Sequence, residues 1–159
     1  MSTGLPSTRE MIAQLIATPS VSCVHADMDM SNRAVIDLIA DWAEKLGFSI
    51  EIQDAAEGKH NLIARAGSGS DGLVFSGHTD TVPCDPKLWS GDPFIAREAD
   101  DRIYGLGSCD MKSFLALALE ASSKINLDRL KRPLTIVATA DEESTMSGAR
   151  LIANNGKKL

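Results

Sequence analysis

An α/β fold is predicted by two features of the sequence. Two apolar runs, which begin at Leu73 and at Leu134, have the length and composition of buried strands. Each run is followed directly by polar side chains, and amphipathic helical patterns precede and separate the runs. Open α/β sheets bind ligands at the carboxyl ends of their strands, so these polar residues are the first candidates for a functional site. The 159 residues suit one domain with a core of its own.

Composition restricts the classes of function. Hydrophobic residues make up 43% of the chain and charged residues 24%, which is typical of a globular protein and excludes a disordered or fibrous one. The net charge is −6 and the basic residues are scattered, so nucleic acid is not an expected partner. No segment is long enough to span a bilayer and the N-terminus has no signal-peptide pattern, so we expect no membrane partner and a cytoplasmic location. The widely spaced Cys23, Cys84 and Cys109 fit free thiols.

The first elements are predicted by local patterns. Ser7 and Glu10 have the spacing of a capping box, and helical periodicity follows until the chain reaches Pro19. A second helix is indicated by an apolar stripe ended by Gly47, which consists of Val35, Leu38, Ile39, Trp42 and Leu46.

Two half-buried strands are predicted next, at 48–52 and 61–65, with a turn between them. His60 stands at the start of the second strand, where a histidine is more often a surface or turn residue than a metal ligand. The glycine- and serine-rich stretch at 67–72 is closely flanked by strand patterns, so it indicates a turn rather than a domain boundary.

The strand that begins at Leu73 should end near His78, because Pro83 cannot lie in a central ladder. Period-two alternation directs His78 and Asp80 the same way. Asp80 can then accept a bond from one imidazole nitrogen and leave the other free for a metal. The alternative is a histidine at a strand end beside a solvated aspartate.

A hairpin and a glycine-rich turn follow. The segments 94–98 and 102–104 predict a hairpin that adds an antiparallel element to the sheet. The G-L-G at 105–107 lacks the third glycine and the Lys-Ser/Thr pair of nucleotide-binding loops, which excludes that interpretation. We expect its glycines to let the backbone present Asp110 at the start of a buried helix, where the simpler alternative for Asp110 is an N-cap.

Carboxylates also follow the second buried strand, at 134–140. Asp141, Glu142 and Glu143 are consecutive, and near a buried strand they raise one another's pKa unless a cation compensates their charge. The alternative is a solvated turn. A further helix is predicted from Ser147.

His78, Asp110 and Glu143 all fall where the ends of core elements can open onto one crevice. One histidine and two carboxylates, with Asp80 behind His78 and Glu142 beside Glu143, form a ligand set suited to Zn²⁺, Co²⁺ or Mn²⁺. The sequence therefore predicts a metal site that uses no cysteine.

Three segments carry a family resemblance. They are S-G-H-T-D-T-V-P at 76–83, G-L-G-S-C-D-M-K at 105–112 and A-T-A-D-E-E-S at 138–144. In this order and spacing they resemble the M20 family of dinuclear zinc amidohydrolases, and the resemblance extends over nearly the whole chain. Three further features favour the branch that deacetylates N2-acetyl-L-ornithine, and these are Trp89, D-P-F at 92–94 and M-S-G-A-R at 146–150.

The resemblance implies a zinc-exopeptidase-like fold, with a three-layer α/β/α arrangement around a mixed sheet. It implies that His78 binds one metal, that Asp110 bridges two and that Glu143 binds the other, with two Zn²⁺ in a complete site and Co²⁺ as an alternative. Asp80 would orient His78. Glu142 would be the general base that takes a proton from water and passes it to the leaving amine. The substrate would be a small N-acylated amino acid, and the products acetate and ornithine would belong to arginine biosynthesis.

Family members are much longer than this chain. The resemblance therefore implies that 1–159 is the N-terminal part of a catalytic domain and that its fold is incomplete, with the dimerisation domain and the C-terminal part of the catalytic domain absent. Only three of five protein ligands would be present, so we expect this chain alone to be inactive. The full-length form would be a homodimer. Ser113, where many relatives have Gly, and Cys109 depart from the family pattern.

Two alternatives remain open. A sister amidohydrolase, such as a succinyl-diaminopimelate desuccinylase or an aminoacylase-type peptidase, would share all three motifs. A non-catalytic remnant that acts as a binding module would not need Glu142. An aspartic protease is excluded because no Gly follows Thr81, and a serine hydrolase is excluded because Ser144 lacks the G-x-S-x-G turn.

Overall fold

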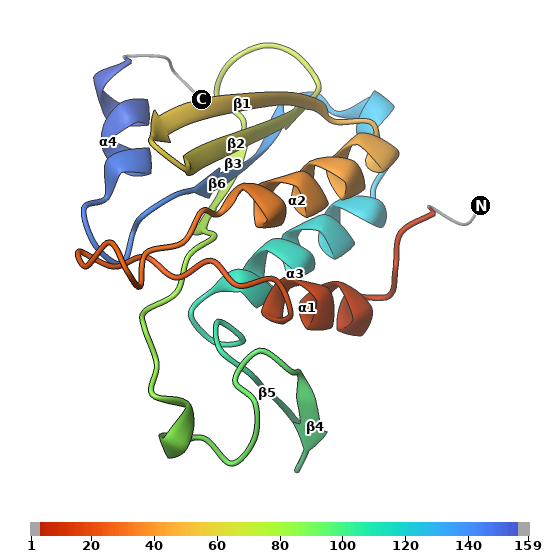
Figure 1. Ribbon diagram of the computed structural model, residues 1–159. Helices are drawn as coiled ribbons and strands as arrows, with labels where there is room; N and C mark the ends of the chain where they lie inside the picture. The colour runs from red at the N-terminus through yellow and green to blue at the C-terminus, as the bar shows by residue number, and fades with distance from the viewer. Residues whose placement is uncertain (1–3, 156–159) are drawn as a thin grey trace.

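The computed structural model describes residues 4–155 and shows a mixed sheet between helices (Figure 1). The sheet has four strands in the order β1-β2-β6-β3, which are β1 (Ser49–Ala56), β2 (Lys59–Ala66), β6 (Leu134–Thr139) and β3 (Leu73–His78). β2 pairs antiparallel with both β1 and β6, whereas β3 and β6 are parallel. The main helices are α1 (Thr8–Ile16), α2 (Arg33–Leu46), α3 (Lys112–Ser123) and α4 (Ser147–Asn154). This mixed α/β architecture confirms the predicted fold class.

The helices cover both faces of the sheet. Leu62 and Ile136 belong to the apolar core beneath α2 and α3, and α1 packs against α3 on the same side (Figure 1). Asn61 neighbours Leu62 in β2 and therefore points to the opposite face. There its Nδ2 donates to the backbone oxygen of Gly148 in α4, at 2.9 Å. The sheet consequently lies between two helical layers.

The predicted start of α1 and the predicted end of α2 are confirmed. The Ser7 side chain accepts from the Glu10 backbone, and the Glu10 carboxylate accepts from the Ser7 backbone in return. Gly47 ends α2 in the left-handed region, with φ of 95°, a conformation that glycine adopts without the steric cost of a Cβ. Among the residues from 4 to 155, no helix has the length and hydropathy needed to cross a membrane.

β3 is not the buried strand that its apolar run predicted. It lies at the edge of the sheet, and Leu73 is 58% exposed. Phe75 is half-buried against Phe114 of α3, with ring centroids 6.4 Å apart in an edge-to-face arrangement. β6, by contrast, is buried at every position because strands flank it on both sides. Composition alone does not distinguish an edge strand from a central one, and this is why the prediction was wrong.

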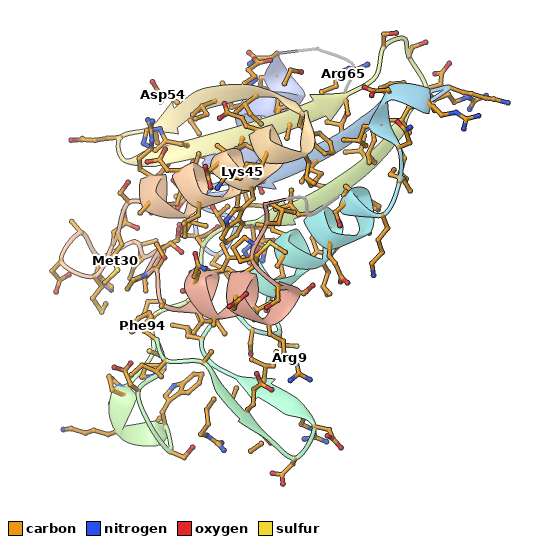
Figure 2. The ribbon with its side chains drawn as sticks, turned by 90° about the vertical axis from the view of Figure 1, so that its right-hand side faces the viewer. Arg9, Met30, Lys45, Asp54, Arg65 and Phe94 are labelled. Carbon is orange, nitrogen blue, oxygen red and sulfur yellow. The ribbon has the colours of Figure 1, made fainter. Side chains whose placement is uncertain are left out.

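The hairpin forms, but it does not join the main sheet. β4 (Arg97–Ala99) and β5 (Arg102–Tyr104) make a separate two-stranded sheet that projects from the body of the molecule (Figure 1). The predicted first strand is shortened because the Asp92 carboxylate accepts from the Phe94 backbone and holds that end in a turn. Figure 2 shows Arg9 of α1 facing the hairpin, where it pairs with Glu98 at 3.0 Å.

Substitution of Gly148 by alanine is expected to destabilise the protein by about 1–3 kcal/mol through overpacking. A Cβ at this position would lie 2.6 Å from the backbone nitrogen of Ala140 and would contact Asn61 Oδ1. Urea unfolding followed by circular dichroism measures the change. Gly91→Ala is the matched control because nothing lies within 4 Å of its added Cβ. Equal stability of the two variants would contradict the close packing of α4.

Candidate metal centre

The ends of β3 and β6 bring the predicted residues together. The two strands are parallel and His78 pairs with Thr139, so the segments that follow them leave the sheet side by side. His78, Glu142 and Glu143 each offer a ligand atom, and these atoms all lie within 4.8 Å of one another. The buried histidine and the two more accessible glutamates form a cluster whose donor types suit a divalent cation.

Asp110 reaches this cluster from the turn before α3. Its Oδ1 lies 3.0 Å from His78 Nε2, although Asp110 is not part of the three-residue group within 4.8 Å. The predicted helix start was two residues too early, because α3 begins at Lys112 and Met111 occupies the cap position. The N-cap interpretation of Asp110 is therefore wrong, and its carboxylate contacts the histidine instead.

Asp80 lies behind His78, as the alternation predicted, but the contact differs in detail. His78 Nδ1 lies 3.0 Å from the backbone oxygen of Asp80 and 3.6 Å from its carboxylate Oδ1. The other carboxylate oxygen, Oδ2, accepts from the backbone N–H of Glu143 at 3.0 Å. Asp80 therefore contacts both His78 and Glu143, and it is only 1% exposed. The second imidazole nitrogen, Nε2, faces Asp110 and Glu142.

The charges of the cluster shift the pKa values of its members. Burial lowers the pKa of His78, but hydrogen bonds to Asp80 and Asp110 and the charge of Asp80 outweigh it and raise the pKa to about 9. Burial raises the pKa of Asp80, and the bonds from His78 and the Glu143 backbone reverse that effect, so the net shift is downward. Burial raises the pKa of Glu143, and the carboxylates of Asp110 and Glu142 add to it against the charge of His78. A bound cation would relieve this repulsion, so the residues present fit a metal.

Protonation of His78 is expected to stabilise the metal-free chain. Its folded pKa of about 9 lies above the ordinary value of 6.5, so the stabilisation is complete below about pH 6.5 and is lost as the pH rises through 9. The difference in unfolding free energy between the wild type and His78→Gln, measured by urea titration in a chelator, should shrink across this range. If the difference in unfolding free energy did not depend on pH, this would contradict the raised pKa of His78.

A cleft of about 500 Å³ adjoins the cluster. Asp110 and Glu143 line it together with side chains from the hairpin and from the loop after β3, which are Val82, Trp89, Arg102, Ile103 and Tyr104. The sequence predicts the hairpin as part of the sheet and predicts no position in a site for Trp89. The structure makes them walls of the cleft, and nothing local in the sequence indicates that contact.

Other residues considered from the sequence lie in ordinary surroundings. His60 lies in β2 rather than in the turn, and its Nδ1 pairs with Asp54 of the neighbouring strand β1 at 2.7 Å, outside the metal cluster. Cys23, Cys84 and Cys109 are free thiols. The sequence predicts no role for Lys112, the last residue of the motif at 105–112, yet the structure buries it next to the Asp110 turn.

The chain is similar to a known protein family and to curated members of one enzyme class. The model of peptidase family M20/M25/M40 matches residues 74–158. The acetylornithine deacetylase of Proteus mirabilis (strain HI4320) is 52% identical over 157 residues, which are 98% of this chain and 41% of that protein. The acetylornithine deacetylase of Photorhabdus laumondii is 50% identical over 155 residues, with 96% and 40% covered. The chain thus spans about two fifths of the length of these relatives.

Solved structures share the fold. Human carnosine dipeptidase 1 superposes with a TM-score of 0.77 at 19% identity, over 93% of this chain and 34% of that one. The M20 family metallo-carboxypeptidase Sso-CP2 from Sulfolobus solfataricus superposes with a TM-score of 0.69 at 23% identity, over 87% and 32%. At these identities the similarity establishes the architecture alone.

Proposed function

The chain belongs to peptidase family M20/M25/M40, and on that basis we propose that it carries metal-binding and acid–base residues of an amide hydrolase. The observation that supports this most directly is the meeting of His78, Glu142 and Glu143 at the ends of β3 and β6. We propose N2-acetyl-L-ornithine as the substrate, since relatives at 52% and 50% identity are acetylornithine deacetylases. Acetate and ornithine would be the products, and the reaction would be a step of arginine biosynthesis. We propose that the full-length enzyme works in the cytoplasm as a homodimer.

We propose Zn²⁺ as the metal, two ions in a complete site, with Co²⁺ as an alternative. His78, Asp110 and Glu143 would hold them. When bound, such a cation polarises the amide carbonyl and lowers the pKa of water. Asp80 would keep His78 in place through its backbone oxygen, which leaves Nε2 directed at the ligand side.

Glu142 is the proposed general base. Its side chain is 43% exposed and its carboxylate lies 3.9 Å from His78 Nε2, so water can reach it at the edge of the cluster. It would take a proton as the water oxygen bonds to the acetamide carbon. The carbon–nitrogen bond then breaks, and Glu142 returns the proton to the leaving amine, which accounts for both products.

A second candidate is a related amidohydrolase that cleaves peptides or N-succinyl-diaminopimelate. Such an enzyme would carry the same three motifs, at 76–83, 105–112 and 138–144. Both candidates use the same cluster, so they differ in substrate and not in mechanism.

A chimera tests the proposal. In it this chain replaces the matching segment of the P. mirabilis enzyme, which is 52% identical to it. We expect the zinc-loaded chimera to hydrolyse N2-acetylornithine faster than N-succinyl-diaminopimelate or dipeptides. Preference for another of these substrates would support the second candidate. A folded, zinc-containing chimera that hydrolyses none of them would contradict the amide-hydrolase proposal.

A further inference from the structure

Lys112 is a lysine buried in the core next to the metal cluster. It is 1% exposed, and no salt bridge joins it to a carboxylate within residues 4–155. Its Nζ donates instead to the backbone oxygen of Thr18, at 2.7 Å, and to Ser20 Oγ, at 3.2 Å. Burying an ammonium without a paired carboxylate is costly, so its hydrogen bonds to Thr18 and Ser20 must compensate for the lost hydration.

The contact with Ser20 leads to the backbone around Asp80. Ser20 Oγ donates to the backbone oxygen of Thr79 at 2.7 Å, and the Thr81 N–H donates to the backbone oxygen of Ser20 at 3.2 Å. The Ser22 N–H donates to the Thr81 oxygen at 2.9 Å, and a parallel bridge joins Val21 to Thr81. The segment 20–22 is therefore hydrogen-bonded to the residues on both sides of Asp80, Thr79 and Thr81.

The main chain of Lys112 supports the turn that carries Asp110. Its N–H donates to the Gly107 oxygen at 2.9 Å and closes the turn that carries Asp110. The stem of Lys112 passes directly beside this turn, because a Cβ on Gly107 would lie 2.8 Å from Lys112 Cδ and 2.9 Å from Thr81 Cγ2. One residue thus contacts both the Asp110 turn and the support of Asp80.

We propose that Lys112 is a positioning residue of the metal centre, which sets the placement of Asp110 relative to His78 by joining the Asp110 turn to the 20–22 segment. The identity of Asp110 and His78 as ligands rests on the proposed function, but the contacts of Lys112 do not. Burial lowers the pKa of Lys112 to about 8, and the charge of Asp80 opposes the shift. This interaction agrees with an ammonium that faces the Asp80 side of the site.

The test compares two buried lysines in the 159-residue chain. Lys112→Met removes the ammonium but keeps the length of the side chain. Lys59→Met is the matched control, because Lys59 is 5% exposed and bonds to Ser22 Oγ in the same segment, yet its Nζ pairs with Asp29 at 2.7 Å and donates no hydrogen bond to the Asp110 turn within residues 4–155. Zinc affinity is measured by calorimetry. Amide hydrogen exchange is measured in the metal-free chain.

We expect Lys112→Met to weaken zinc binding about 10- to 100-fold, the range typical of residues that orient metal ligands. In the metal-free chain, exchange should accelerate at least about tenfold at the Thr81 and Glu143 amides, which bond to Ser20 and Asp80, while central β2 and β6 amides keep their rates. Lys59→Met should leave zinc affinity within about threefold of the wild type.

Unchanged zinc affinity and unchanged exchange in Lys112→Met would overturn the proposal, as would an equal loss of zinc affinity in Lys59→Met. If the wild-type chain binds no zinc, the metal assignment fails, but the exchange rates of the metal-free chain still decide whether Lys112 positions the site. If Lys112→Met does not fold, Ser20→Ala replaces it, since that variant keeps the lysine and removes only the hydroxyl that links it to Thr79.

Discussion

Replacement of Glu143 by alanine is expected to weaken zinc binding to the chain by more than about 100-fold, beyond the loss typical of residues that only orient ligands. Glu143 offers one of the three ligand atoms grouped within 4.8 Å. Burial raises its pKa, and the neighbouring carboxylates add a repulsion that a cation would relieve. The substitution keeps the backbone N–H that donates to Asp80 Oδ2, so the support of the site remains. Calorimetry measures the affinity.

Glu44→Ala is the control for this measurement, because Glu44 is an exposed carboxylate on α2. It should bind zinc as the wild type does. Circular dichroism should show that both variants are folded. Zinc affinity unchanged in Glu143→Ala would exclude Glu143 as a ligand and would leave His78 and Asp110 as the residues to test.

Substitution of Glu142 by glutamine is expected to lower kcat of the chimera about 10²- to 10⁴-fold while its zinc content is unchanged. Glutamine has the shape of glutamate but cannot accept the proton of the attacking water. KM should change little, because the carboxylate acts on the proton transfer and not on substrate affinity. The measurement is steady-state hydrolysis of N2-acetylornithine beside metal analysis of the same sample.

Glu44→Gln in the same chimera is the control and should keep its activity. Two results would count against Glu142 as the base. One is a kcat within tenfold of the parent chimera, and the other is a loss of activity that parallels a loss of zinc. The second result would identify Glu142 as a residue that holds metal, which its 3.9 Å separation from His78 Nε2 allows.

The sequence alone determined the features that depend on neighbouring residues. Ser7 with Glu10, the stripe ended by Gly47 and the apolar run of β6 predicted α1, α2 and a buried strand correctly. These signals can be read from the sequence because the residues that form a capping box, or that form neighbouring positions of a helical stripe, are only a few positions apart in the chain. The three motifs also identified the family, since their order and spacing can be read directly from the chain.

Only the tertiary structure decided the features that depend on distant residues. β3 lies at the edge of the main sheet, and β4 and β5 form a separate sheet. Strand order depends on pairings between distant segments, which no local pattern encodes. The bond from Ser20 to Thr79 spans 59 positions, and that from Lys112 to Thr18 spans 94. The residues of the proposed metal cluster were therefore readable from the sequence. The buried polar contacts that support them were not, because these contacts form only where separate segments pack together.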